Sequence, residues 1–429
     1  MTPAARLSAA IEVLADIGAR RRPAADALKD WGLAHRFAGS GDRAAIGGLV
    51  YDALRRKASS AWIMRSDAPR AVLLGMLRLE RGLDAAAIAR LGEGRFAPDP
   101  LTADERTRLA AADLSDAPAH VFGDYPEWLD AHLAASFGEA RGDEGAALAK
   151  RAPLDLRVNA LKASREEARS AIAPLGAQAT PWSPLGLRIV HGPEAKSPAI
   201  HAEPAFLKGQ IEIQDEGSQV AALLSGAAPG EQVVDLCAGA GGKTLALAAM
   251  MANKGQIYAT DSDKRRLAPI HARLERAGAR NVQIRTPRPG QDALADIAGQ
   301  ADLVVIDAPC SGTGAWRRNP DAKWRMRPGA LEQRRKQQAE VLDRAVTLLK
   351  PEGRIAYITC SVLKDENDEQ VRAFLGRHAG FAVRDLAIGV LGESETAFRE
   401  GVLATRYGLL MTPRRTRTDG FFVSLLSRP

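Results

Sequence analysis

The feature of this sequence that most constrains its fold is the alternation of short apolar runs with helical segments in its C-terminal half. From Gln210 onward, the runs predict strands at Gln232 to Leu236, Gln256 to Thr260, Asn281 to Ile284, Leu303 to Ile306, Arg354 to Ile358 and Phe421 to Leu425. A strand, a helix and a second strand in succession form a parallel pair with a crossover helix. The alternation therefore predicts a doubly wound, Rossmann-like α/β domain on a parallel sheet.

The first part of the chain predicts a separate helical domain. Between Ala4 and Leu91, apolar residues recur at helical spacing, as in Leu7, Ile11, Leu14 and Ile17. The Gly, Pro and Asp residues from Gly92 to Pro100 predict a linker, and Pro126 opens another helical stretch.

A small α+β unit is predicted between these two parts. Leu154 to Leu161 alternates like a strand, Ser164 to Leu175 has helical spacing, and Leu187 to Val190 predicts a second strand. We therefore expect three domains: an all-α domain at 1–140, an α+β unit at 141–205 and the α/β domain at 206–429.

Charge and composition restrict the classes of partner. The 429 residues include 59 Lys and Arg against 52 Asp and Glu, a net charge of +7 that favours a polyanionic partner. The basic cluster Arg55 to Lys57 ends a predicted helix, so it fits RNA contact or a solvated helix cap equally well. No apolar run approaches the roughly 20 residues of a membrane span, and we find no secretory signal. Three cysteines cannot form a disulfide framework, which favours free thiols in a reducing cytoplasm.

A loop of small residues after the first strand of the α/β domain predicts a nucleotide-like ligand. It comprises Cys237, Ala238, Gly239, Ala240, Gly241, Gly242 and Lys243, followed by an apolar helix. Small residues allow close approach to the backbone, and the helix N-terminus offers free N–H groups. Neither a P-loop nor a complete dinucleotide fingerprint fits, because Cys237 and Thr244 stand where each pattern needs glycine. Asp261 ends the second strand and is placed to accept bonds from ribose hydroxyls, although it could instead cap the next helix.

Two of the three cysteines follow neighbouring strands. Asp307, Pro309 and Cys310 come at the end of the fourth strand and Cys360 at the end of the fifth, so both thiols are expected at the ligand-binding edge of the sheet. Each thiol alone is more often a small buried hydrophobe. Their spacing of 50 residues, with no histidine in a ligand-like pattern, does not favour a metal site. Asp307 would repel a thiolate at Cys310, so it suits a proton partner to a nitrogen heterocycle.

At these residues the sequence resembles the Sun (Fmu) family of S-adenosylmethionine-dependent RNA cytosine-5 methyltransferases. The segments that carry the resemblance are Gln214–Gln219, Asp235–Lys243, Asp307–Gly314, Arg317–Trp324, Tyr357–Ser361 and Arg417–Phe422. Residues 42–56 are similar to the NusB-like RNA-binding domain of the bacterial 16S ribosomal RNA branch. Gly239 and Ala240 depart from the usual Ala-Pro, and the family's acid after the third strand is replaced by the basic run 284–289, which leaves Asp292 as a weak candidate.

The resemblance implies a mechanism and a set of site residues. The loop 237–243, Asp261 and Asp307 would bind S-adenosylmethionine. Cys360 would attack cytosine C6, Asp307 would act at N3, and Cys310 would assist loss of the C5 proton and release of Cys360. The Pro-Cys cysteine is the nucleophile in DNA cytosine-5 methyltransferases, so exchanged roles for Cys310 and Cys360 stay open.

The partner implied is RNA, either ribosomal RNA or a ribosomal assembly intermediate, bound by a monomer away from membranes. The basic residues Arg317, Arg318, Lys323, Arg325 and Arg327 would steer phosphates, and Trp316 or Trp324 would stack on a splayed base, although a packing role fits each of them equally. Two alternatives belong to other classes: an RNA-binding assembly factor without turnover, against which the intact Cys310, Cys360 and Asp307 argue, and a P-loop nucleotide hydrolase, against which Cys237 argues.

Overall fold

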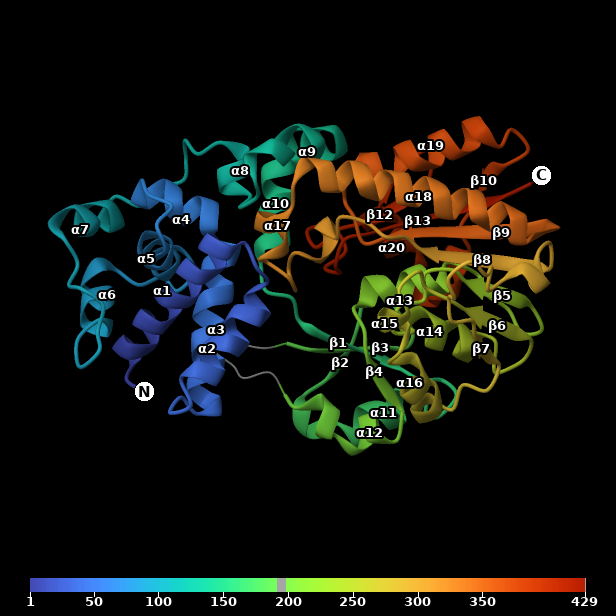
Figure 1. Cartoon of the computed structure of the whole chain (residues 1–429), viewed down its shortest axis with the longest axis horizontal. Coiled ribbons are helices and arrows are strands. Elements are labelled where there is room, and N and C mark those ends of the chain that lie inside the picture. Colours follow the sequence, from blue (N-terminus) through green and yellow to red (C-terminus); the bar gives the residue numbers. More distant parts are fainter. Residues whose placement is uncertain (191–197, 429) are drawn as a thin grey trace. The chain divides into compact units, whose positions relative to one another are not determined.

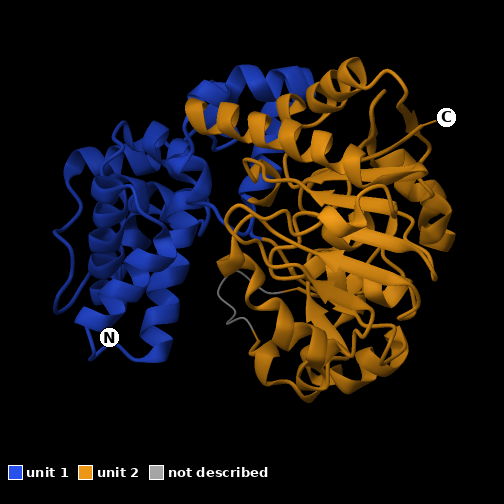
Figure 2. Cartoon of the chain, turned by 45° about the vertical axis from the view of Figure 1, so that its right-hand side comes forward, with its two compact units in different colours: residues 1–151, 192–196, 316–327 blue, residues 152–191, 197–315, 328–429 orange. Residues whose placement is uncertain are grey.

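A computed structural model describes residues 1–190 and 198–428, and the chain divides into two compact units. Unit 1 comprises residues 1–151 together with Trp316–Arg327, and unit 2 comprises 152–190, 198–315 and 328–428 (Figure 2). The short segment Trp316–Arg327 therefore belongs with the N-terminal helices, although the chain on both sides of it belongs to unit 2.

Unit 1 is all helical. Its helices are α1 (Pro3–Arg20), α2 (Ala24–Ala34), α3 (Ser40–Arg55), α4 (Lys57–Met64), α5 (Pro69–Leu79), α6 (Ala85–Leu91), α7 (Ala103–Ala110), α8 (Ala119–Phe122), α9 (Asp130–Phe137), α10 (Arg141–Ala149) and α17 (Ala322–Arg325) (Figure 1). Thr2 caps α1 by accepting the Ala5 amide at 3.2 Å, and Pro3 occupies its first position, where a missing N–H costs nothing. A Cβ at Gly75 of α5 would lie 2.7 Å from Cα of Ser60, so this glycine lets α4 and α5 pack closely. The predicted linker at Gly92 to Pro100 joins α6 to α7 within this unit.

Unit 2 begins with a four-stranded antiparallel sheet in the order β2-β3-β1-β4. The strands are β1 (Leu154–Val158), β2 (Gln178–Ala179), β3 (Gly186–Ile189) and β4 (Ile211–Ile213), with helices α11 (Arg165–Ala171) and α12 (Pro204–Leu207). The predicted strands near Leu154 and Leu187 and the helix between them are confirmed. The placement of the predicted domain boundaries at 140 and 205 stays a prediction.

The larger sheet of unit 2 confirms the predicted α/β class. Its order is β11-β12-β13-β9-β8-β5-β6-β7, and β10 pairs with β13. The bounds are β5 (Gln232–Asp235), β6 (Gln256–Ala259), β7 (Val282–Ile284), β8 (Ala301–Asp307), β9 (Leu349–Thr359), β10 (Ala382–Arg384), β11 (Leu403–Ala404), β12 (Leu409–Met411) and β13 (Phe421–Ser427). β7, β6, β5, β8 and β9 are parallel neighbours.

The last strand differs from the expected parallel arrangement. β13 pairs antiparallel with β9, with Phe422 opposite Thr359, and antiparallel with β12. The nine residues 412–420 between β12 and β13 contain no helix, and an antiparallel neighbour needs no crossover helix. The alternation of strands and helices thus predicts the parallel part of the sheet and ends before β13.

Helices cover the larger sheet in Figure 1. They are α13 (Glu216–Leu223), α14 (Gly242–Met250), α15 (Lys264–Leu267), α16 (Ile270–Ala277), α18 (Pro328–Leu348), α19 (Asp368–Arg377) and α20 (Glu395–Gly401). Val220 of α13 and Leu247 of α14 share a core with Leu303 and Val305 of β8. Side chains alternate between the faces of a strand, so Val304 and Ile306 point to the other face. Both are fully buried there.

No helix among residues 1–190 and 198–428 is long and apolar enough to cross a membrane.

Candidate active site

The loop between β5 and α14 brings backbone close to any ligand at the edge of the sheet. Gly239 and Gly241 have φ values of +51° and +83°, which glycine adopts without strain. A Cβ at Gly241 would lie 2.5 Å from Cγ1 of Ile270, so glycine is required there. The backbone N–H groups at the start of α14 lie directly after this loop, where an anionic or polar ligand can accept hydrogen bonds from them.

Asp261 is hydrogen-bonded to this loop. Its side chain is almost fully buried, and Oδ2 accepts the Gly239 amide at 2.9 Å while Oδ1 accepts the Asp263 amide at 2.9 Å. The alternative that Asp261 caps the next helix is wrong, because Asp263 caps α15 by accepting the Arg265 amide at 2.8 Å. Arg266 Nη1 lies 3.6 Å from Oδ2, and a carboxylate offers about four lone-pair sites, so Asp261 can accept further donors beside the two amides.

The remaining loop residues are closely packed. Ala238, Gly239, Gly241 and Lys243 are buried, and Cys237, Ala240 and Gly242 are half-buried. Burial, followed by the charge of Asp235, raises the pKa of the Cys237 thiol well above its usual value, so this cysteine stays protonated and unreactive. Burial also raises the pKa of Asp235 to about 7, and its Oδ2 accepts the Thr244 hydroxyl at 2.6 Å.

The two thiols at the strand ends lie next to each other, as the sequence predicts. Cys310 follows β8 and Cys360 follows β9, and these strands are parallel neighbours with Asp307 opposite Ile358. The sulfur atoms are 3.4 Å apart and both side chains are half-buried. A ligand at this edge of the sheet can therefore be reached by both thiols.

The surroundings of Cys310 favour its protonated form. The hydrogen bond to Cys360 is the largest of the effects that raise the pKa of Cys310 well above its usual value, followed by burial and the charges of Cys360 and Glu366. The thiol of Cys310 therefore gives up its proton less readily than an ordinary cysteine does. Because only the thiolate is nucleophilic, this raised pKa disfavours Cys310 as an attacking group.

Asp307 lies beside a buried ammonium group. Lys243 Nζ is 2.8 Å from Asp307 Oδ2, and the same ammonium group is 5.0 Å from the ring centroid of Phe421. The Lys243 side chain is 5% exposed and that of Asp307 37% exposed, so the carboxyl group is open to a ligand on the side away from the lysine. Lys243 thus contacts Asp307, the predicted catalytic acid. The sequence analysis did not predict this contact.

Backbone hydrogen bonds join the two cysteine loops to the Arg417–Phe422 motif. The Gly314 amide donates to the Cys360 carbonyl at 2.9 Å, and the Gly420 amide donates to the Gly314 carbonyl at 2.9 Å. A Cβ at Gly314 would lie 2.1 Å from the Gly420 carbonyl oxygen. The glycines of the Asp307–Gly314 and Arg417–Phe422 motifs are therefore needed for this close approach.

The smaller sheet supports the loop between β5 and α14. Arg157 of β1 is buried and donates to the Gly242 carbonyl at 2.8 Å and to the side chain of Gln214. Arg273 of α16 donates to the Ala240 carbonyl at 2.7 Å. The sequence analysis missed both arginines, because isolated basic residues carry no signal for a buried role.

Several residues that were candidates for RNA contact are buried in unit 1. Trp316, Arg317 and Lys323 are 1%, 5% and 1% exposed. Lys323 donates to the Arg55 carbonyl at 3.1 Å, and Arg55 in turn donates to the Arg317 carbonyl at 2.5 Å. Of the two roles considered for these three residues, packing is therefore the one that the structure supports.

The basic cluster at the end of α3 is also not a free surface. Arg55 is buried, and Arg56 pairs with Glu80 at 2.7 Å.

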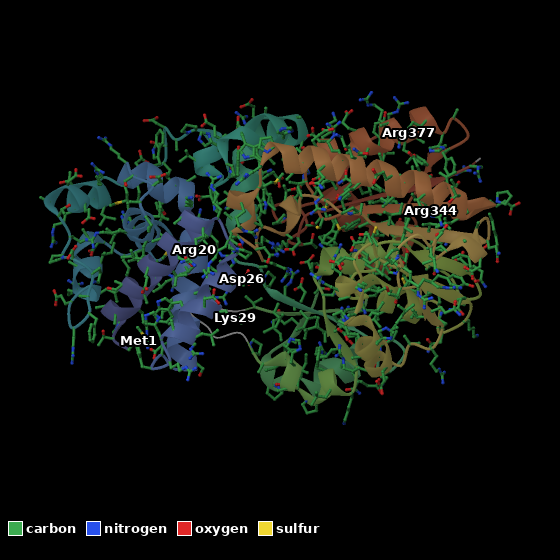
Figure 3. All side chains as sticks on the ribbon, in the orientation of Figure 1. Met1, Arg20, Asp26, Lys29, Arg344 and Arg377 are labelled. Carbon is green, nitrogen blue, oxygen red and sulfur yellow. The ribbon has the colours of Figure 1, made fainter. Side chains whose placement is uncertain are left out.

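Arg20 and Lys29, which lie on α1 and α2, are exposed (Figure 3). Asp292, the weak candidate for the missing acid, pairs with Arg344 of α18 at 2.6 Å.

Comparisons with known proteins agree with these motifs. Residues 222–427 match the family model of the 16S rRNA methyltransferase RsmB/F, and residues 125–194 match that of a ferredoxin-like domain of RsmF/B-like methyltransferases. The chain is 30% identical over 307 residues to a probable ribosomal RNA small subunit methyltransferase B of Synechocystis, and 34% identical over 258 residues to a ribosomal RNA small subunit methyltransferase B of Photorhabdus laumondii. These alignments cover 71% and 59% of this chain, and 67% and 58% of the relatives. The crystal structure of PH0851 superposes with a TM-score of 0.70 at 26% identity, covering 100% of this chain and 99% of that one.

Proposed function

The chain belongs to the RsmB/F family of 16S rRNA methyltransferases, and on this premise we propose that it methylates C5 of a cytosine in 16S ribosomal RNA through a covalent adduct with Cys360. The observation that carries the proposal is the pair of sulfur atoms 3.4 Å apart at the edge of the sheet where β8 ends in Asp307. A factor that only binds RNA has no use for two adjoining thiols.

The methyl donor of the family is S-adenosylmethionine, and the residues present fit it. The backbone from Cys237 to Gly242 would face the donor, and Asp261 would accept its ribose hydroxyls with lone pairs that Gly239 and Asp263 leave free. At Gly239 a side chain would enter the space between Asp261 and Arg266, from which a Cβ would be 3.9 Å and 3.5 Å away. When bound, the donor supplies an electrophilic methyl group.

Cys360 makes the cytosine reactive. Its thiolate forms a bond to C6, which moves electron density to C5 and makes that carbon nucleophilic. Asp307 stabilises the adduct through a proton that it shares with N3 of the cytosine, and Lys243, with Nζ 2.8 Å from Oδ2, holds the carboxyl group in place.

Cys310 resolves the adduct. After methyl transfer, C5 carries both its proton and the methyl group. Cys310 assists removal of that proton, the C6–sulfur bond breaks, and Cys360 leaves as a thiolate while N3 returns its proton. The target base leaves any stack before this chemistry begins, because neither thiol reaches C6 within a helix.

Nucleoside analysis tests the proposed reaction. Transcribed 16S RNA treated with the full-length protein and S-adenosylmethionine, then digested, should yield 5-methylcytidine that matches an authentic standard by chromatography and mass. A methylated nucleoside of any other kind would overturn the assignment to C5.

The two thiols are distinguished by substitution. Cys310→Ala should permit methyl transfer but leave the protein attached to RNA as a slow band on a denaturing gel, whereas Cys360→Ala should give neither band nor methylation. A trapped band with Cys360→Ala in place of Cys310→Ala would mean that the roles are exchanged, as in the DNA enzymes.

A further inference from the structure

Two consecutive buried residues beyond Cys360 contact both thiol loops. Glu366 ends a 3-10 turn (Lys364–Glu366), and Asn367 precedes α19. They are 0% and 1% exposed. Nothing in the predicted chemistry uses either of them, and a buried carboxylate requires an explanation.

Glu366 holds the residue that follows Cys310. Its Oε1 accepts the Ser311 amide at 2.8 Å and the Gln338 amide at 3.0 Å, and its Oε2 accepts the Ser311 hydroxyl. Gln338 also donates to the Pro309 carbonyl at 3.0 Å. Glu366 and Gln338 together fix the backbone on both sides of Cys310.

Asn367 makes the equivalent contacts around Cys360. Its Oδ1 accepts the Thr359 hydroxyl at 2.6 Å, and its Nδ2 donates to the Ser361 carbonyl at 2.9 Å. One side chain thus bonds both chain neighbours of Cys360. Because Glu366 and Asn367 share a peptide bond, the two cysteine loops are attached to one rigid piece of backbone.

We propose that Glu366 and Asn367 are positioning residues, which set the separation of the two thiols by holding the Cys310 loop and the Cys360 loop respectively. The inference rests on the proposed function. Each residue should then act on one step: Asn367 on formation of the C6 adduct, and Glu366 on its resolution. A displacement of about 1 Å in a reacting group costs on the order of 100-fold in rate.

The variants are compared in single turnover with full-length protein, transcribed 16S RNA and labelled S-adenosylmethionine. Asn367→Ala should slow methyl transfer by about 100-fold without a trapped band. Glu366→Ala should transfer the methyl group at a rate within about tenfold of the wild type but accumulate the slow-migrating adduct. Glu366→Gln is the matched control, because its amide can accept from Ser311 and Gln338 and donate to the Ser311 hydroxyl, and it should resolve the adduct. Calorimetry with S-adenosylmethionine alone should give unchanged affinity in all three.

Equal slowing of both steps by Asn367→Ala and Glu366→Ala, with no rescue by Glu366→Gln, would mean a structural role only and would overturn the proposal. A wild-type protein that makes no 5-methylcytidine would instead refute the proposed function. Alkylation of the thiols in the absence of RNA provides a reading that does not depend on catalysis. Cys360 and Glu366 are ionisable groups whose charges act on Cys310, so Glu366→Gln should shift alkylation of Cys310 to lower pH. An unshifted profile would contradict the placement of Glu366 against the Cys310 loop.

Discussion

Replacing Asp261 by alanine tests where the methyl donor binds. Without the Asp261 carboxylate, the ribose would lose a charge-assisted hydrogen bond worth about 1.5 to 3 kcal/mol. This loss corresponds to a rise in the Kd of S-adenosylmethionine of about 10-fold to 150-fold. The change also frees the Gly239 amide, now bonded at 2.9 Å, so the true loss should lie toward the upper end of this range. Isothermal calorimetry with S-adenosylmethionine and no RNA measures it directly.

Two further variants separate ligand contact from loop support. Asp261→Asn keeps an acceptor for the Gly239 amide without the charge and should lose less affinity than Asp261→Ala. Asp263→Ala removes a carboxylate of the same type, whose side chain caps α15, and this variant should bind the donor as the wild type does. A folded Asp261→Ala protein with a Kd within about threefold of the wild type, which is under 1 kcal/mol, would refute the assignment.

Three other predictions follow from burial and charge. Asp124 and Lys323 are both buried in unit 1, and the charge of each acts on the pKa of the other. Asp124→Asn and Lys323→Met should each lower the free energy of unfolding in urea denaturation by about 1 to 3 kcal/mol, because each leaves buried polar groups with fewer partners. The double variant should lose less than the sum of the two, and strict additivity would show that the charges do not interact. The pKa of Asp235 is raised to about 7 in the folded protein, so the contribution of this group to stability is present below pH 4 and is lost as pH rises through 7. The urea midpoint of the wild type should therefore fall relative to that of Asp235→Asn between about pH 5 and 8, and parallel pH profiles of the two proteins would contradict this prediction. If unit 1 binds RNA through its exposed basic residues, Lys29→Gln and Arg36→Gln should each reduce the slope of log RNA affinity against log salt concentration by roughly 1. Filter binding measures this slope, and an unchanged slope would mean that the RNA binds elsewhere.

The parts of the fold that sequence predicts are those set by local periodicity. Each parallel strand contains a short apolar run, so β5 to β8 are found near their true bounds, whereas β9 begins at Leu349, before the predicted start at Arg354. The meeting of Cys310 and Cys360 follows from the same pattern, because residues that end adjacent parallel strands share one edge. β10, β11 and β12 have two or three residues each, too short for an alternation to register.

The parts that sequence does not predict depend on partners distant in the chain. Lys323 resembles a surface residue until its contacts with Arg55 and its proximity to Asp124 are known. Glu366 and Asn367 resemble the acidic and polar residues that open many helices, and only the packing of the Cys310 loop gives them another role. Burial of a charged group requires tertiary partners, and periodicity carries no information about those.

The passage of Trp316–Arg327 through unit 1 has a consequence for biosynthesis. Trp324 donates from its indole nitrogen to the Leu54 carbonyl at 2.6 Å, and Asp321 accepts the Ala24 amide at 3.2 Å. These groups on α2 and α3 emerge from the ribosome long before the segment that satisfies them. The N-terminal helices are made first but reach their final packing only after residue 327 has been translated, by which time most of the parallel sheet has also been synthesised. An N-terminal fragment that stops near residue 151 would therefore expose surfaces that the complete chain covers, and a chaperone that guards such surfaces would be needed longest for the part of the protein that is made earliest.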